Sequence, residues 1–565
     1  MKDAGTEQAE VQPRRGGEAV PVHVSGTNGD GRPALARVVT RLLGRESGAP
    51  EAPHREEDIT PHPEVGPAER VVETRPIRPP YSFVRIVFDE ERSAHRYEVL
   101  EPPLTDEERD AYAFVRDAFM RSLDVDLGTL DRQGARAYLS REYEALAKRH
   151  GLRLSSLSRA RVGYYLERDF LGFGVIDAIM NDPSIEDVSC DGPKLPIFIY
   201  HRKFESIRTN VTFPGDDALD GFVMQLVQRS GKHISVAEPL VDATLPDGSR
   251  LQASLSREVT TRGSTFTIRK FRKDPLTPTD LLAFETLSPE MMAYWWLAVE
   301  HGASAIICGG TASGKTTSLN ALSLFIPPQK KIVSIEDTRE LNIPHENWIP
   351  GVTRAGGVGD ERSDGKRPGE VDMFDLLKAA LRQRPEYLLL GEVRGAEAYV
   401  LFQAMATGHT VYSTMHADSV QSAVHRLESK PIDIPRNMLS SLDIVCVQGE
   451  VRIQGRRVRK MREIVELTGI DPRTGELITN RVFSWDPQEG RFRYSGVSFV
   501  LGRVAEESNL PESDLRREFD RRVRVLLAMQ KRGLRDIASV SRVIVDYSID
   551  PDRTLRGLEG EARNG

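Results

Sequence analysis

The amino-acid sequence predicts an α/β protein with two ordered domains, the larger one built on a parallel β-sheet. The chain of 565 residues is long enough for three to four domains. Its 39% hydrophobic and 28% charged residues are ordinary for a globular protein. After residue 300, short apolar segments alternate with amphipathic ones, a pattern typical of a parallel sheet covered by helices on both faces.

Shifts in composition divide the chain into six segments. The first eighty residues contain 11 of the 34 prolines and bury too little apolar surface to offset the entropy of ordering, so we expect a flexible, disordered tail. Prolines and a capping threonine between Lys273 and Asp280 indicate a linker. The predicted segments are the tail at 1–80, a helical front piece at 81–155, a small α/β domain at 156–273, the linker at 274–280, the main α/β domain at 281–500 and a helical region at 501–565.

Alternating and helical patterns give the elements of the front piece and the small domain. Thr105 begins a capping-box pattern ahead of a helix, and helical spacing continues to Phe170. We expect strands at 81–88, 185–190, 196–201, 206–211 and 265–271, and a helix at 216–230.

The main domain alternates strands with helices. We expect strands at 304–308, 331–335, 387–390 and 410–415, and helices from 315, at 373–384, at 396–406 and at 512–532. A hairpin at 443–467, turning at 454–455, closes the sheet. In the last helix, one stripe is predicted to face the core or a partner: Leu515, Phe519, Val523, Leu526 and Leu527.

Charge and cysteine content exclude several classes of protein. Lys and Arg number 77 against 84 for Asp and Glu, so the net charge of -7 gives no overall basic field, and no nucleic-acid partner is expected. The three cysteines, Cys190, Cys308 and Cys446, have neither disulfide-framework nor zinc spacing, which favours a cytoplasmic location. No run of about 18 apolar residues suggests a membrane span.

A glycine-rich loop carries the strongest chemical signal. The pattern G-x-x-x-x-G-K-[ST] follows an apolar strand and precedes a helix, the context in which backbone N–H groups cradle a phosphate. Lys315 is expected to reach the β- and γ-phosphates of ATP, and the Thr316 hydroxyl to bind Mg²⁺. The predicted nucleotide-binding residues are Gly309, Gly310, Thr311, Ala312, Ser313, Gly314, Lys315, Thr316 and Thr317.

Carboxylates follow two of the predicted strands. Glu336 comes after the strand at 331–335, and Glu392 comes after the strand at 387–390. Ligands bind outside the carboxyl ends of strands in parallel sheets, so both side chains should meet the glycine-rich loop at one edge. We expect them to polarise the attacking water and to hold the metal shell, with Glu392 as a magnesium ligand. The sequence does not decide which of the two is the general base.

Four motifs in this order resemble those of the type II/type IV secretion ATPase superfamily, in particular an archaeal member. Besides the loop, they are IEDTREL at 335–341, LLLGEVRGAEA at 388–398 and GHTVYSTMHA at 408–417. The resemblance covers roughly residues 80–550. It implies a RecA-like P-loop NTPase motor domain with catalytic roles for Glu336 and Glu392. It also implies that His409 and His416 sense the γ-phosphate or couple it to domain movement.

The histidines and three arginines have alternative explanations. A shared metal is excluded for His409 and His416, because seven residues of strand place them on opposite faces, but ordinary packing or hydrogen bonding stays open. By resemblance to the family's arginine-bearing hairpin, Arg250, Arg262 and Arg269 are expected to supply positive charge to the transition state. They are equally compatible with exposed ion pairs.

The resemblance implies a cytoplasmic Mg²⁺-dependent ATPase at the membrane periphery. It would form a homohexamer beneath a polytopic membrane platform protein and power an archaellum or a type IV pilus-like filament. Three alternatives stay open at this point: a type II/IV protein secretion motor, a DNA-dependent recombinase or helicase, and a non-catalytic scaffold gated by nucleotide.

Overall fold

The computed structural model describes residues 59–122, 131–272, 274–354, 367–453 and 456–560. The chain divides after Asp182 into two compact units. Most of the predicted tail and the predicted turn at 454–455 lie outside the described residues. None of the helices in the described ranges is long and apolar enough to cross a membrane.

The first unit begins with a small antiparallel sheet. β1 (Glu69–Arg78) pairs with β2 (Ser82–Asp89), which pairs with β3 (Ala94–Leu100). The predicted end of the tail at residue 80 is therefore wrong. No residue of β1 is fully buried, whereas β2 is buried along most of its length. The order of β1 thus comes from backbone pairing with an apolar neighbour, which local composition does not reveal.

Helices complete this unit. Thr105 caps the first of them as predicted, since its hydroxyl accepts the N–H of Glu108 at 3.2 Å and the Glu108 carboxylate accepts the N–H of Thr105 at 2.9 Å. The helices are α3 (Asp106–Ser122), α4 (Arg132–Arg149), α5 (Ser156–Phe170), a 3₁₀ turn at Gly174–Ile176 and α6 (Asp177–Asn181).

The second unit opens with an antiparallel sheet in the order β6-β5-β4-β9-β8-β7. The predicted strands at 185–190 and 196–201 are confirmed at both ends. The elements are β4 (Ile185–Cys190), β5 (Pro196–His201), β6 (Glu205–Thr212), α7 (Asp216–Arg229), β7 (Leu240–Thr244), β8 (Arg250–Ser254) and β9 (Thr265–Arg269).

The main domain contains a second sheet in the order β12-β11-β13-β14-β10-β15-β16-β17-β18. Its first six strands are parallel and the last three antiparallel. The strands are β10 (Ala305–Gly309), β11 (Ile332–Glu336), β12 (Trp348–Val352), β13 (Tyr387–Leu390), β14 (Thr410–Met415), β15 (Ile444–Ile453), β16 (Arg456–Ile470), β17 (Leu477–Asp486) and β18 (Arg491–Tyr494).

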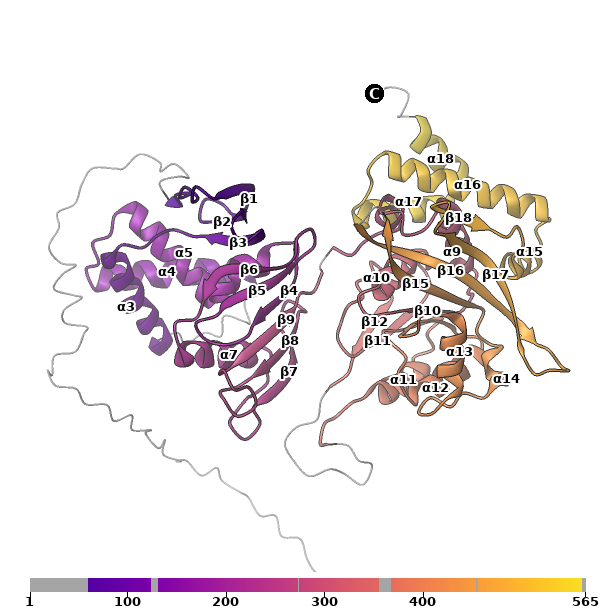
Figure 1. Ribbon diagram of the computed structural model, residues 1–565, viewed down its shortest axis with the longest axis horizontal. Coiled ribbons are helices and arrows are strands. Elements are labelled where there is room, and N and C mark those ends of the chain that lie inside the picture. The colour runs from indigo at the N-terminus through magenta and orange to yellow at the C-terminus, as the bar shows by residue number, and fades with distance from the viewer. Residues whose placement is uncertain (1–58, 123–130, 273, 355–366, 454–455, 561–565) are drawn as a thin grey trace, which may run out of the picture. The chain divides into compact units, whose positions relative to one another are not determined.

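Helices cover both faces of this sheet, as the sequence predicts (Figure 1). Ile307 of β10 belongs to the core on one face, while Ile306 and Cys308 belong to the core on the other. The helices are α8 (Pro278–Ala283), α9 (Pro289–Glu300), α10 (Lys315–Ser323), α11 (Met373–Arg382), α12 (Glu397–Ala406), α13 (Val420–Glu428), α14 (Arg436–Leu439), α15 (Phe499–Glu507), α16 (Glu512–Lys531), α17 (Ile537–Ile549) and α18 (Pro551–Gly560).

The C-terminal helices α16, α17 and α18 gather at one end of the main domain (Figure 1). Within the stripe predicted on α16 to face the core or a partner, Leu515 and Leu526 are buried in the core, whereas Leu527 is 44% exposed. The buried face instead includes Arg522. Its guanidinium lies over the rings of Trp296 and Tyr547, 5.0 and 5.6 Å from their centroids, so cation–π contacts stabilise a charge on a face for which the sequence suggests only apolar residues.

Arg522 also forms ion pairs, so its substitution tests how α16 packs on the main domain. It donates to Glu300 at 2.5 Å and to Glu518 at 3.0 Å. We expect Arg522→Ala to lower the free energy of unfolding by about 2–3 kcal/mol, because Glu300 loses its charged partner beside an apolar core, while Glu518 keeps Arg521 and Tyr547. The control Arg517→Ala removes an exposed pair with Asp514 and should cost less than about 0.5 kcal/mol. Equal losses in urea denaturation would contradict this assignment.

Candidate functional site

The glycine-rich loop, residues 309–317, connects the end of β10 to the start of α10. Gly314 has φ = 90° and Ala312 has φ = 59°, so the chain turns through the left-handed region just before the helix. The side chain of Lys315 folds back over the loop. Its Nζ donates hydrogen bonds to the carbonyls of Gly309, at 3.1 Å, and Gly310, at 2.8 Å. Burial lowers the pKa of the Lys315 amine, and the charge of Glu392 partly offsets this effect.

Tight packing against β15 holds the loop in place. A Cβ added to Gly309 would lie 2.3 Å from the carbonyl oxygen of Gln448, so no larger residue fits there. The Gln448 side chain accepts from the Ser318 hydroxyl at 2.7 Å and reaches Gly314. Sequence reasoning missed Gln448, since a glutamine in a strand carries no motif; only its position next to the loop strand reveals its role.

Glu336 is the last residue of β11. Its side chain is buried beside the segment that follows the neighbouring strand β13. One carboxylate oxygen accepts the N–H groups of Glu340, at 2.9 Å, and Leu341, at 3.0 Å. Its other oxygen, Oε2, is buried and has no hydrogen-bond partner among the described residues. Burial raises the pKa of Glu336 to about 7. The side chain can therefore exchange a proton near neutral pH.

Glu392 stands two residues beyond the end of β13. The neighbouring strand β14 fixes this segment, because Thr414 donates its hydroxyl to the carbonyl of Gly391 at 2.6 Å. Glu392 accepts from Arg394 Nε at 2.8 Å, and Arg394 also pairs with Asp337 at 3.2 Å. Arg394 thus bridges the two acidic strand ends.

The loop and both glutamates lie at one edge of the sheet. β11, β13, β14 and β10 are consecutive parallel neighbours, so their carboxyl ends point the same way. Lys315 has electrostatic interactions with Glu392, Glu340 and Arg394. Glu336 thus ends one strand and Glu392 follows another, and both strands end at the edge of the sheet that carries the glycine-rich loop.

The model of the type II/IV secretion system protein family matches residues 173–483. The chain belongs to this family.

Relatives of the chain include archaeal and bacterial proteins. An uncharacterized protein of Methanocaldococcus jannaschii is 38% identical over 413 residues, 72% of each chain. The type IV secretion system protein PtlH of Bordetella pertussis is 33% identical over 265 residues, 40% of this chain and 75% of PtlH. Among solved structures, the pilus retraction motor PilT with bound ADP is 20% identical and covers 51% of this chain and 80% of PilT, with a TM-score of 0.35.

The two histidines of this secretion-family chain lie at opposite ends of β14. His416 follows the strand and is exposed at the same edge of the sheet as the glycine-rich loop. Its backbone carbonyl accepts a hydrogen bond from Arg426 at 2.7 Å. His409 precedes the strand, and its Nδ1 lies 3.2 Å from both the Thr407 hydroxyl and the Ala404 carbonyl. A strand of six residues spans about 20 Å, so the structure does not bring His409 to the loop.

Two of the three predicted arginines face each other on the small sheet, and the third lies at the other end of the same hairpin. Arg250 begins β8 directly opposite Arg269 at the end of β9, and Arg262 lies in the connection between these strands. Arg269 is 63% exposed and pairs with Asp187 at 3.3 Å. Within the described ranges, no hydrogen bond or ion pair joins them to residues 309–317. Their predicted role thus requires a movement of this domain or a second subunit.

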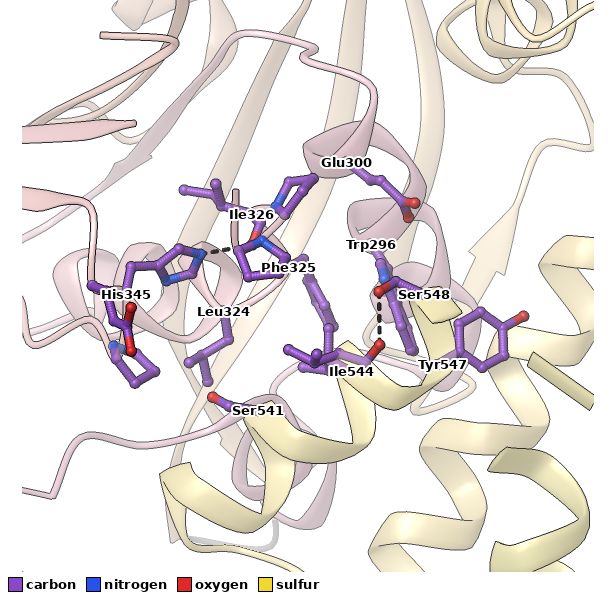
Figure 2. Close-up of a pocket in the computed structure, with 15 residues that line it drawn as sticks. Trp296, Glu300, Leu324, Phe325, Ile326, His345, Ser541, Ile544, Tyr547 and Ser548 are labelled. Atoms are coloured by element: carbon purple, nitrogen blue, oxygen red, sulfur yellow. Dashed lines mark hydrogen bonds between the residues drawn. The ribbon is translucent and has the colours of Figure 1, made fainter. Parts of the chain in front are cut away.

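A separate cavity of about 370 Å³ lies among α9, α17 and the segment that leads from α10 to β11 (Figure 2). Trp296, Phe325 and Tyr547 form much of its wall, and His345 Nε2 lies 2.8 Å from the carbonyl of Ile326. The segment between α10 and β11 leads into the amino end of β11. The cavity therefore lies at the sheet edge opposite the glycine-rich loop and belongs to no part of the predicted site.

The raised pKa of Glu336 predicts a pH dependence of stability. The folded chain holds this proton more tightly than the unfolded chain, so the stabilisation is complete below the ordinary pKa of 4.5 and is lost as the pH rises through about 7. Between pH 4.5 and pH 8, we expect the free energy of unfolding of the wild type to fall by about 3 kcal/mol relative to Glu336→Gln. Urea denaturation at several pH values measures this difference. Parallel pH profiles would contradict it.

Proposed function

We propose that this secretion-family protein hydrolyses ATP and converts the energy into movement of its domains. The convergence of Lys315, Glu336 and Glu392 at one sheet edge carries the proposal. A loop of this geometry offers N–H groups and a helix N-terminus to an anion, and α10 begins directly at Lys315. The open space around Gly310, where an added Cβ would meet no atom within 4 Å, leaves room for phosphate against the backbone.

The residues present also fit Mg²⁺ next to the phosphates. Thr316 offers a hydroxyl from the first turn of α10, and Glu392 offers a carboxylate from the neighbouring strand end. Oxygen ligands of this kind are those that Mg²⁺ prefers, usually together with several waters and substrate phosphates. The ion, when bound, neutralises charge on the phosphate oxygens.

Side chains of the protein bind the phosphates, accept the proton and orient the water. Lys315 holds the β- and γ-phosphates. Glu336, with a free buried oxygen and a pKa of about 7, accepts the proton of the attacking water, and Glu392 orients that water and the metal shell. Arg394 keeps Glu392 in place through its hydrogen bond of 2.8 Å. Arg250, Arg262 and Arg269 supply further positive charge when the small domain closes.

The cellular role that we propose is a cytoplasmic motor attached to the membrane through another protein. Six copies form a ring under a polytopic membrane platform protein and drive an archaellum or a type IV pilus-like filament. Family membership supports a secretion-type machine. The similarity to PtlH, which is named as a type IV secretion system protein, favours protein secretion as a second candidate.

A hydrolysis assay tests the enzymatic part. The purified chain is expected to release phosphate from ATP with MgCl₂ and to lose this activity with excess EDTA. Binding of ATP without phosphate release would instead support a nucleotide-gated scaffold. Release that depends on added DNA, and that declines steeply with salt, would support a nucleic-acid motor.

A further inference from the structure

The hairpin of β15 and β16 extends beyond the glycine-rich loop. The last residue of β10, Gly309, is opposite Gln448, but β15 continues for five more residues and pairs with β16 throughout this extension. The extension therefore borders the side of the loop that faces away from Glu336 and Glu392, because β15 is next to β10 on one side, whereas β14, β13 and β11 follow on the other.

Arg459 of this extension contacts the loop. It is opposite Glu450, two residues from Gln448, so it shares a face with the glutamine that contacts Gly314. A Cβ placed on Gly314 would lie 3.4 Å from Arg459 Cδ. The aliphatic stem of Arg459 thus packs on the residue that precedes Lys315, at the start of α10.

The charge of Arg459 has no partner in the described part of the chain. Its neighbour Arg457 pairs with Glu450 at 3.4 Å, but Arg459 forms no ion pair or hydrogen bond there. An exposed guanidinium against an anion-binding loop repels the positive end of α10 unless an anion lies between them. Arg459 is thus placed to bind the same ligand as the loop.

The direction of the ligand decides which part Arg459 meets. The γ-phosphate must face Glu336 and Glu392, where water is activated. The α-phosphate end of the nucleotide then faces the opposite side, toward β15 and β16. We propose that Arg459 binds the α-phosphate of the nucleotide, an inference that rests on the proposed ATPase function. Because the α-phosphate is not at the bond that breaks, a contact with it stabilises the bound substrate and the transition state equally.

Three substitutions separate this role from packing. Arg459→Met keeps the stem on Gly314 but removes the charge, and we expect it to raise the KM for ATP and the Kd for ADP about tenfold while kcat changes less than threefold. Arg459→Lys should recover part of the affinity. The matched control, Arg457→Gln, removes a charge that Glu450 already neutralises and should leave both constants within twofold of the wild type.

Titration with ADP and steady-state assays give the decisive readouts. Wild-type affinity in Arg459→Met, or a loss confined to kcat, would overturn the inference while leaving the proposed function intact. Equal losses in Arg457→Gln would also overturn it. A wild-type protein that binds no nucleotide would overturn both proposals. Thermal unfolding of each variant confirms that the compared proteins are folded.

Discussion

Lys315→Ala is expected to remove ATP hydrolysis, lowering kcat/KM by at least about 100-fold. The ammonium is the cation that the loop itself directs at the phosphates, and loss of one preorganised group of this kind costs about 10² to 10³ in rate. In the structure its Nζ is held by the carbonyls of Gly309 and Gly310, so it is positioned before any ligand arrives. Phosphate release from ATP measures the effect.

Lys331→Ala is the control for this substitution. Lys331 precedes β11 at the opposite edge of the sheet, where it donates to the carbonyl of Gln383 at 2.8 Å. Its removal should leave turnover within about twofold, because exposed contacts of this kind contribute little. Similar rates in Lys315→Ala and Lys331→Ala would show that the loop does not hold the reacting phosphate.

Glu392→Gln is expected to lower kcat about 10²- to 10⁴-fold while nucleotide binding is retained. The amide keeps the size of the side chain but loses the negative charge that faces Lys315 and Arg394. It can neither hold the metal shell nor polarise water as a carboxylate does. Parallel measurement of ADP affinity and phosphate release separates the two effects.

The same strand offers a control for Glu392. Glu386 precedes β13 at the other edge of the sheet and pairs with Lys330 at 2.6 Å. Glu386→Gln should leave kcat within about twofold, since Glu386 lies at the amino end of β13, away from the glycine-rich loop. A normal kcat in Glu392→Gln would remove this glutamate from the reaction and leave Glu336 as the only candidate base.

The sequence predicted the parts of the site that local chemistry determines. The apolar strand before Gly309, the glycine-rich loop that leads into a helix and the carboxylates after two strands all follow from short patterns that have the same meaning in any α/β sheet. Their convergence could be predicted because parallel strands place their carboxyl ends at one edge. The secretion family was also named correctly from these motifs.

Long-range pairing was not predictable in the same way. Gln448 and Arg459 reach the loop from strands more than a hundred residues away, and their positions depend on which strand borders β10. Arg522 is buried because Glu300 and Trp296 meet it from α9, more than two hundred residues away. β1 is ordered by its pairing with β2. The partners of Gln448, Arg459 and Arg522 are distant in sequence, so no local pattern contains them.

The most direct test of the central claim is a structure of this protein with a non-hydrolysable ATP analogue and Mg²⁺. We expect Lys315 to contact the β- and γ-phosphates, the Thr316 hydroxyl to bind the metal, and the carboxylates of Glu336 and Glu392 to lie within reach of a water beside the γ-phosphate. A triphosphate bound elsewhere, or a γ-phosphate that faces away from both carboxylates, would contradict the account.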